Sequence, residues 1–187
     1  MHRLPAPRGV GALTAEGPAR RRAGLLLLAV AAVVVVVDQA VKVLVLDTLV
    51  PGRFVPFLGD AVGWQLVFNP GAAFGVPLPA PVFPIATLVV LVVVLRSLGE
   101  AGVVGTLAQG LVIGGAVGNL ADRVVRAAPG EPLGGLVVDF VAWGSFPRFN
   151  VADAAITVGV VLLLLVLLRE ERRAAAGSGG AAAAESS

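Results

Sequence analysis

The sequence predicts an all-α polytopic membrane protein with four transmembrane helices and a small β-element on its outer face. Of its 187 residues, 57% are hydrophobic, more than the roughly 45–50% that is usual for soluble domains. The hydrophobic residues fall into four blocks, at about 24–46, 76–95, 103–121 and 151–168. Each block is close to the ~20 residues that one membrane crossing requires. Between the first two blocks, segment 47–75 has short strand-like pieces punctuated by Pro, Gly and Asp.

The ends of the four blocks support this division. Block 24–46 follows a basic stretch and could be a signal peptide, but it is too long and lacks a small-residue cleavage site. Block 76–95 has its prolines at the start, where a helix tolerates them. Asp122 and Arg123 end the third block, and the charged run REERR follows the fourth.

The distribution of basic residues predicts the topology. Most of the 14 Lys and Arg residues lie in the N-terminal tail, in the short turn at 96–102 and after residue 168. The positive-inside rule places these segments in the cytoplasm. We therefore expect disordered cytoplasmic tails at 1–23 and 169–187, around a membrane domain at 24–168. Segments 47–75 and 123–150 would then lie on the outer side.

The composition restricts the possible chemistry. The chain has no cysteine, and its single histidine, His2, lies in the N-terminal tail. Disulfides, thiolate metal sites and catalysis by a Ser–His or Cys–His pair are therefore not expected. We expect no cofactor and no metal. Because most arginines flank hydrophobic blocks, they indicate topology, and no nucleic-acid partner is expected.

Asp38 and Lys42 lie toward the outer end of the first block, four residues apart and so on one helix face. Charged groups in a membrane segment cost about 2.5–3.5 kcal/mol each on translocon scales. One interpretation is an intrahelical ion pair, with the lysine reaching the interface. The other is a polar contact that belongs to a functional site.

Two further groups contain polar residues among small ones. Asn69 begins the turn NPGAAFG, which favours close packing, although the asparagine could hydrogen-bond into a site. In the third block, Gly110, Gly114 and Gly118 recur every fourth residue, which is typical of close helix packing in lipid. Asn119, Asp122 and Arg123 follow, and a structural Asp–Arg network is at least as plausible there as catalysis.

The most informative pair is Asp139 and Asp153, both set among hydrophobic residues. Either one alone would be interpreted as a helix N-cap or turn residue. The turn at 144–147 can fold back, however, and bring Asp139 toward Asp153. Two carboxylates in one low-dielectric site cannot easily both ionise, so one is protonated while the other is charged. This is what aspartic proteolysis requires, without histidine, cysteine or metal.

Five motifs in this order resemble the lipoprotein signal peptidase family, also called signal peptidase II. They are DQxxK (38–42), NPGAAFG (69–75), GGAVGNLADR (114–123), VVDF (137–140) and FNVAD (149–153). The resemblance implies an intramembrane aspartic endopeptidase of the bacterial cytoplasmic (inner) membrane. Its substrates would be diacylglyceryl-modified prolipoproteins, cut just before the lipidated cysteine. The protein would also contact membrane lipid.

The resemblance also implies roles for individual residues. Asp139 and Asp153 match the family's catalytic pair. The positions that match polar groups around the substrate pocket are Asp38, Lys42, Asn69, Asn119, Asp122, Arg123 and Asn150. With the active site near the outer face, the dyad would meet a bond held at the membrane–water boundary by the substrate's acyl chains.

Two other functions remain open at this point. A small proton-coupled transporter also uses intramembrane acids, but it should place them near the bilayer midplane. A catalytically inactive scaffold would bind lipoprotein precursors without cutting them, although both candidate aspartates are present here.

Overall fold

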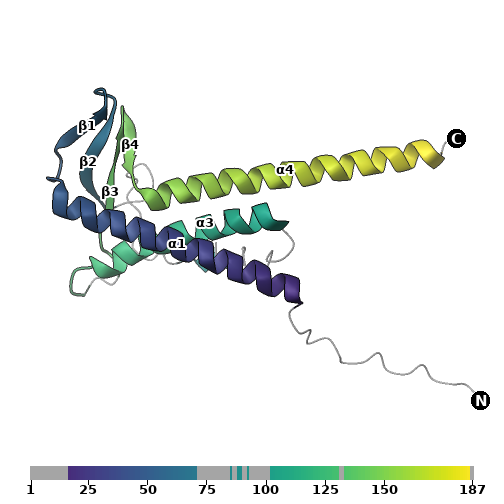
Figure 1. Ribbon diagram of the computed structural model, residues 1–187, viewed down its shortest axis with the longest axis horizontal. Coiled ribbons are helices and arrows are strands. Elements are labelled where there is room, and N and C mark those ends of the chain that lie inside the picture. The colour runs from purple at the N-terminus through teal and green to yellow at the C-terminus, as the bar shows by residue number, and fades with distance from the viewer. Residues whose placement is uncertain are drawn as a thin grey trace, which may run out of the picture.

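Three long helices and a four-stranded sheet make up the described part of the chain (Figure 1). The computed structural model describes residues 17–70, 102–130 and 133–185, together with Ile85, Leu88, Val89 and Val92, and gives only the backbone for 174–185. The elements are α1 (Pro18–Thr48), β1 (Phe54–Leu58), β2 (Val62–Asn69), α3 (Gly102–Val125), β3 (Val137–Trp143), β4 (Phe146–Phe149) and α4 (Val151–Glu185).

Three segments in the described residues are long and hydrophobic enough to cross a membrane. They are Pro18–Thr48, Gly102–Val125 and Val151–Arg173, and they match the first, third and fourth hydrophobic blocks. The predicted second span, at 76–95, lies outside the described residues except for a few helical positions. The count of four spans therefore stays a prediction.

Two helix boundaries differ from the prediction. α1 begins at Pro18, inside the segment expected to be a disordered tail, with proline at the start of the helix where its missing N–H has no cost. α4 continues to Glu185, through most of the other expected tail. The end of α4 is rich in alanine, the residue with the highest helix propensity. The assignment of 169–187 as a disordered cytoplasmic tail stays a prediction.

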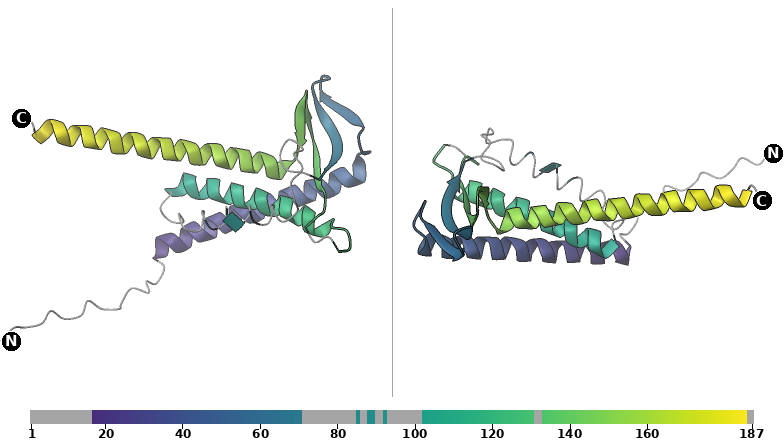
Figure 2. Two further views of the ribbon diagram at one scale, coloured as in Figure 1. Left: turned by 180° about the vertical axis from the view of Figure 1, so that it is seen from behind. Right: turned by 90° about the horizontal axis from the view of Figure 1, so that it is seen from above.

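The sheet is antiparallel, in the order β1-β2-β3-β4, and lies at one end of the helices (Figures 1 and 2). β1 and β2 come from segment 47–75, where strands were expected. β3 and β4 come from the segment after α3, which was expected to be only a connection. Gly144, at φ +48°, forms the tight turn between them. The fold-back was predicted, but its strand structure was missed.

The sheet packs on the end of α1 through a small hydrophobic core. Val45 of α1 is buried with Leu66 of β2 and with Val138 and Phe140 of β3. Because side chains alternate along a strand, burying Val138 and Phe140 on one face turns Asp139 to the other. The sheet therefore fixes the direction in which Asp139 points.

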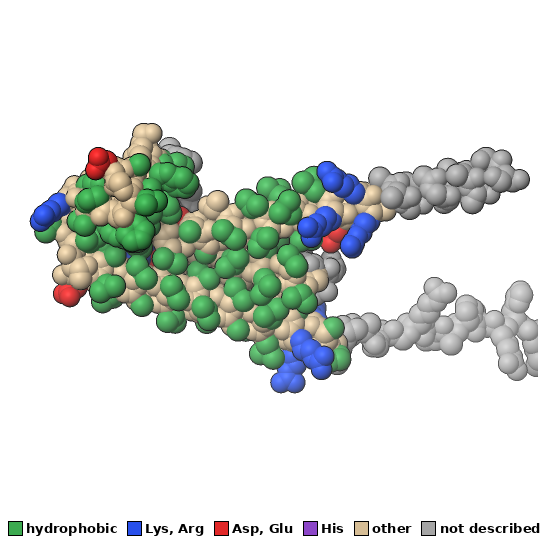
Figure 3. Space-filling model, turned by 45° about the horizontal axis from the view of Figure 1, so that its top comes forward, with side chains coloured by type: hydrophobic (Ala, Val, Ile, Leu, Met, Phe, Trp, Pro, Cys, Tyr) green, Lys and Arg blue, Asp and Glu red, His purple; other side chains and the backbone are tan. Residues whose placement is uncertain are grey.

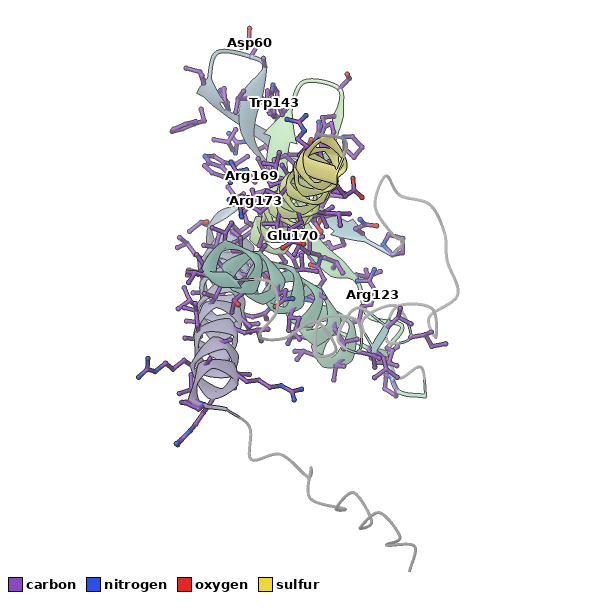
Figure 4. The ribbon with its side chains drawn as sticks, turned by 90° about the vertical axis from the view of Figure 1, so that its right-hand side faces the viewer. Asp60, Arg123, Trp143, Arg169, Glu170 and Arg173 are labelled. Atoms are coloured by element: carbon purple, nitrogen blue, oxygen red, sulfur yellow. The ribbon has the colours of Figure 1, made fainter. Side chains whose placement is uncertain are left out.

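Hydrophobic side chains cover the outside of the helices, as expected of surfaces in contact with lipid (Figure 3). Val33, Val36 and Val43 of α1 and Leu164 and Leu167 of α4 are among the exposed ones. Lys and Arg side chains gather at the helix ends that point away from the sheet (Figure 3). Figure 4 labels two of these arginines, Arg169 and Arg173, on α4.

α3 packs between α1 and α4 through its glycines. Gly110 and Gly114 face α1, opposite Val30 and Val34, while Gly115 faces Ala152 of α4. These contacts agree with the interpretation of the glycine repeat as a packing motif, because small residues let helices approach closely in lipid.

Replacing Gly114 by leucine should separate α1 from α3. A Cβ atom at this position would already lie 2.7 Å from Val34 Cβ, so a larger side chain forces the helices to shift. Overpacking of this kind costs about 1–3 kcal/mol or more. We expect a lower midpoint of thermal unfolding in detergent. The control is Val36→Leu, which enlarges an exposed side chain on the outer face of α1. Equal stability of Gly114→Leu and wild type would contradict the packing.

Candidate active site

A cluster of polar and charged side chains is buried where the three helices meet the sheet. Asp38, Lys42, Asp122 and Asn150 have no exposed surface, and Asp139 is 2% exposed. They come from α1, α3, β3 and the start of α4, so the cluster exists only in the folded protein. Burial of this many charged groups requires ion pairs and hydrogen bonds that compensate the lost hydration.

Lys42 is the central cation of the cluster. Its Nζ lies 2.8 Å from Asp38 Oδ2 and 2.8 Å from Asp122 Oδ2. It also donates a hydrogen bond to Asn119 Oδ1 at 3.2 Å. The ion pair predicted between Asp38 and Lys42 is confirmed, but the lysine is fully buried and does not reach the interface. The cation thus joins α1 to α3.

Asp122 uses both carboxylate oxygens. Oδ2 pairs with Lys42 and accepts a hydrogen bond from the Val138 backbone N–H at 3.1 Å. Oδ1 lies 2.6 Å from Arg126 Nη1 and accepts a hydrogen bond from Gln39 Nε2 at 3.2 Å. The aspartate on α3 therefore holds the backbone of β3 at the residue before Asp139.

Asp139 points from β3 into the cluster. Asn69 Nδ2 donates to Asp139 Oδ2 at 2.9 Å, and Asn150 Nδ2 donates to Oδ1 at 2.7 Å. Burial, together with the nearby Asp153 charge, raises the pKa of the Asp139 carboxyl to about 6, although the hydrogen bonds from the two asparagines and the charge of Lys42 oppose the shift. A carboxyl group with this pKa can exchange a proton near neutral pH.

Asp153 lies in the first turn of α4 and is only partly buried. Asn119 Nδ2 donates to its Oδ1 at 2.7 Å, and the Asn150 backbone N–H donates to its Oδ2 at 3.2 Å. In return, Asn150 Oδ1 accepts from the Asp153 N–H at 2.9 Å. This reciprocal pair is a capping box in which Asn150 is the N-cap, so Asp153 has a capping role as well as a place in the cluster.

Asn150 connects the two candidate catalytic aspartates. It contacts Asp139 through its side chain and Asp153 through its backbone N–H, and it also donates to Asn119 Oδ1 at 3.1 Å. Asp38 supports the same region, because its Oδ1 accepts a hydrogen bond from the Ala152 N–H at 2.9 Å. The start of α4 is thereby tied to α1, α3 and β3.

Arg123 of α3, labelled in Figure 4, is 4% exposed. It lies within electrostatic range of Asp122, Asp139 and Asp153. It is the second buried cation of the cluster. Its position beside the aspartates agrees with the Asp–Arg network expected from the sequence, although its neighbours include Asp139 and Asp153 as well as Asp122.

The structure brings all the site residues predicted from the sequence into one region. They are Asp38, Lys42, Asn69, Asn119, Asp122, Arg123, Asp139, Asn150 and Asp153. Two residues that contact Asp122 in this cluster, Gln39 and Arg126, were not identified from the sequence. Gln39 lies inside the DQxxK motif, and Arg126 is four residues after Asp122, a spacing that allows an ion pair on a helix. Residues 71–75 of the NPGAAFG motif lie outside the described residues.

The arrangement is suited to acid–base chemistry. It pairs a buried carboxyl of raised pKa with a second, partly exposed carboxylate, and amide groups fix both. Among the residues that the structure describes, no group of His, Cys, Asp and Glu has the form of a metal site. The buried acids of the cluster on the helices, Asp38 and Asp122, lie toward the sheet end, as does Asp153 in the first turn of α4. This placement speaks against the transporter hypothesis.

Comparisons with known proteins agree on one family. The profile of Peptidase_A8, described as signal peptidase (SPase) II, matches residues 30–169. A lipoprotein signal peptidase of Mycobacterium bovis is 41% identical over 82% of this chain and 75% of its own length. One of Mycobacterium leprae is 41% identical over 67% of this chain, and the match spans 63% of that relative.

A solved structure described as a bacterial membrane enzyme has the same fold. It superposes with a TM-score of 0.68 and 29% sequence identity, over 78% of this chain and 88% of its own. A second structure with this description gives a TM-score of 0.65 over 76% of the chain.

Proposed function

We propose, from the premise that the chain belongs to the signal peptidase II family, that it is an intramembrane aspartic endopeptidase. Its substrates are prolipoproteins that carry diacylglycerol on a cysteine, and it cuts the bond just before that cysteine. Asp139 and Asp153 are the catalytic pair. The single observation on which this rests is that Asn150 contacts both aspartates while the other cluster residues hold each in place.

The charge balance of the cluster supports a shared proton on the pair. The cluster contains the carboxylates of Asp38, Asp122, Asp139 and Asp153 and the cations of Lys42, Arg123 and Arg126. With every group ionised, the cluster carries one excess negative charge. A single proton on the Asp139–Asp153 pair removes this charge, and an uncompensated charge in such a site is costly.

The proposed reaction uses that proton. The ionised aspartate takes a proton from a water molecule, and the water oxygen attacks the carbonyl carbon of the scissile peptide bond. The protonated aspartate donates to the carbonyl oxygen, which gives a neutral tetrahedral intermediate. When the C–N bond breaks, the aspartate that took the proton from water donates it to the nitrogen of the lipidated cysteine. The other aspartate takes back a proton from a hydroxyl group of the intermediate, so the pair again holds one proton. The products are a signal peptide with a new carboxylate and a mature chain with a free amine.

The location of the site fits this substrate. We place both termini in the cytoplasm and the sheet at the outer face of the bacterial inner membrane, because arginines gather at the opposite helix ends (Figure 3). The acyl chains of the substrate lie in the outer leaflet, so the bond before the cysteine lies near the membrane–water boundary. Asp153, which is partly exposed, can receive water there.

Activity should decrease at alkaline pH. Asp139 has a pKa of about 6, above its ordinary value of 3.8, so the shared proton is lost as the pH rises through and beyond this range. We expect kcat to fall about tenfold per pH unit on the alkaline limb. The measurement is a pH–rate profile in detergent. Constant kcat from pH 6 to 9 would contradict a role for this proton.

The same shift predicts a change in stability. Because the folded-state pKa of Asp139 is raised, the protonated form favours folding, fully below about pH 4. This contribution is lost as the pH rises through about 6. The pH dependence of thermal unfolding, compared between wild type and Asp139→Ala, isolates it, and identical pH dependence in the two proteins would exclude it.

The proposed function is tested with purified protein in detergent. Wild type should convert a diacylglyceryl-modified prolipoprotein into two fragments, and an unmodified precursor is the control for lipid recognition. If the precursor is retained but never cut, the protein is a binding scaffold and the proposal is wrong.

A further inference from the structure

Arg126 follows the last residue of α3 and forms an ion pair with Asp122. The Nη1–Oδ1 distance is 2.6 Å, the Arg126 side chain is 22% exposed, and the Asp122 side chain is fully buried. Fully exposed ion pairs contribute little to stability because water screens them. Here the Arg126 side chain is mostly buried and the Asp122 side chain fully buried, so this ion pair should contribute more to stability than an exposed one.

The ion pair divides the two oxygens of Asp122 between different tasks. Arg126 and Gln39 contact Oδ1, which leaves Oδ2 for Lys42 and for the backbone N–H of Val138. Val138 directly precedes Asp139 in β3. An unbroken chain of contacts therefore runs from Arg126, through Asp122, to the backbone beside Asp139.

Arg126 also affects the electrostatics of the whole cluster. The charged groups that face this region are Asp38 and Lys42 from α1, Asp122 and Arg123 from α3, Asp139 from β3 and Asp153 from α4. Lys42 pairs with both buried carboxylates, Asp38 and Asp122, and Arg126 adds a second cation at Asp122. Removing Arg126 would make the cluster more negative by one charge. The added negative charge would oppose ionisation of the remaining carboxyls.

We propose that Arg126 is a positioning residue for the reaction: it fixes the Asp122 carboxylate, which in turn holds the strand backbone that aims Asp139. The inference rests on the proposed function, because it assigns a task within that peptidase. Arg126 lies outside the motifs by which the sequence resembles the family, so it adds a residue to the site.

The test compares Arg126→Gln with wild type by cleavage kinetics and by hydrogen exchange. We expect kcat to fall roughly 10- to 100-fold with little change in KM, because small displacements of a catalytic group have effects of this size. Loss of one cation should shift the pH–rate profile to higher pH, by on the order of half a pH unit. The Val138 amide should exchange faster with deuterium, measured by NMR in detergent micelles, since its acceptor is no longer fixed.

Two variants make the comparison specific. Arg126→Lys retains the charge and should restore the wild-type pH profile and part of kcat. Arg53→Gln removes an equal charge from an exposed turn before β1 and should leave kcat, the pH profile and Val138 exchange unchanged.

The outcomes separate the two proposals. Arg126→Gln with wild-type kcat, pH profile and Val138 exchange would overturn the role of Arg126. So would a loss of activity that only follows a loss of folded protein, with the pH profile unchanged. Failure of wild type to cut the lipidated precursor would instead contradict the proposed function.

Discussion

Asp139→Asn and Asp153→Asn should each lower the rate of prolipoprotein cleavage by at least about 10³-fold. In the proposed reaction one aspartate is the general base and the other the general acid, and asparagine can perform neither task. General acid–base catalysis contributes roughly 10²–10⁴-fold per group, and the two groups act as a unit. The measurement is single-turnover cleavage of a diacylglyceryl-modified precursor.

Two substitutions of Asp153, by asparagine and by alanine, should differ in stability, which gives an internal control. Asp153 belongs to the capping box of α4, and asparagine retains an oxygen that can accept the same backbone hydrogen bond. Asp153→Asn should therefore stay folded while inactive. Asp153→Ala removes this acceptor and should unfold more easily, by about 0.5–1.5 kcal/mol for each hydrogen bond lost. If either asparagine variant cuts at the wild-type rate, that aspartate is not catalytic.

Lys42→Met should be the most destabilising single change in the cluster. It removes the Lys42 ion pairs of Asp38 and Asp122, two fully buried carboxylates, while Asp122 keeps its ion pair with Arg126. Removing one partner of a buried ion pair costs about 3–5 kcal/mol. For a chain of this length we expect the midpoint of thermal unfolding in detergent to fall by about 10 °C.

A double variant distinguishes lost charge balance from lost packing. Asp38→Asn combined with Lys42→Met removes one carboxylate together with the cation and leaves Asp122 paired with Arg126. We expect it to recover part of the stability that Lys42→Met loses. If the double variant is less stable than Lys42→Met alone, the ion pair does not explain the effect.

The helices could be predicted because their signals are local. Long hydrophobic blocks and flanking arginines located α1, α3 and α4, and the glycine repeat indicated their close packing. The β3–β4 hairpin was missed because Val137–Trp143 is almost entirely buried. It therefore lacks the alternation of polar and hydrophobic residues that marks a half-exposed strand.

The site residues could be located by sequence, but their partners could not. Motif positions identified Asp139 and Asp153, whereas the capping box and the hydrogen bonds of Asn150 depend on how α4 meets β3 and α3. Lysine near a helix end is expected to reach water, yet Lys42 is held inside by carboxylates from two helices. Arg126 carried only a spacing signal, which is common on helices and indicates no site by itself.

Mass spectrometry of the fragments tests the central claim most directly. Purified wild type would be incubated with a diacylglyceryl-modified prolipoprotein, and both fragments would be identified beside an Asp139→Asn control. We predict a mature fragment that begins with the lipidated cysteine and a signal peptide that ends at the residue before it, with neither in the control. An uncut precursor, a cut at another bond, or equal cutting by the variant would contradict the proposed peptidase.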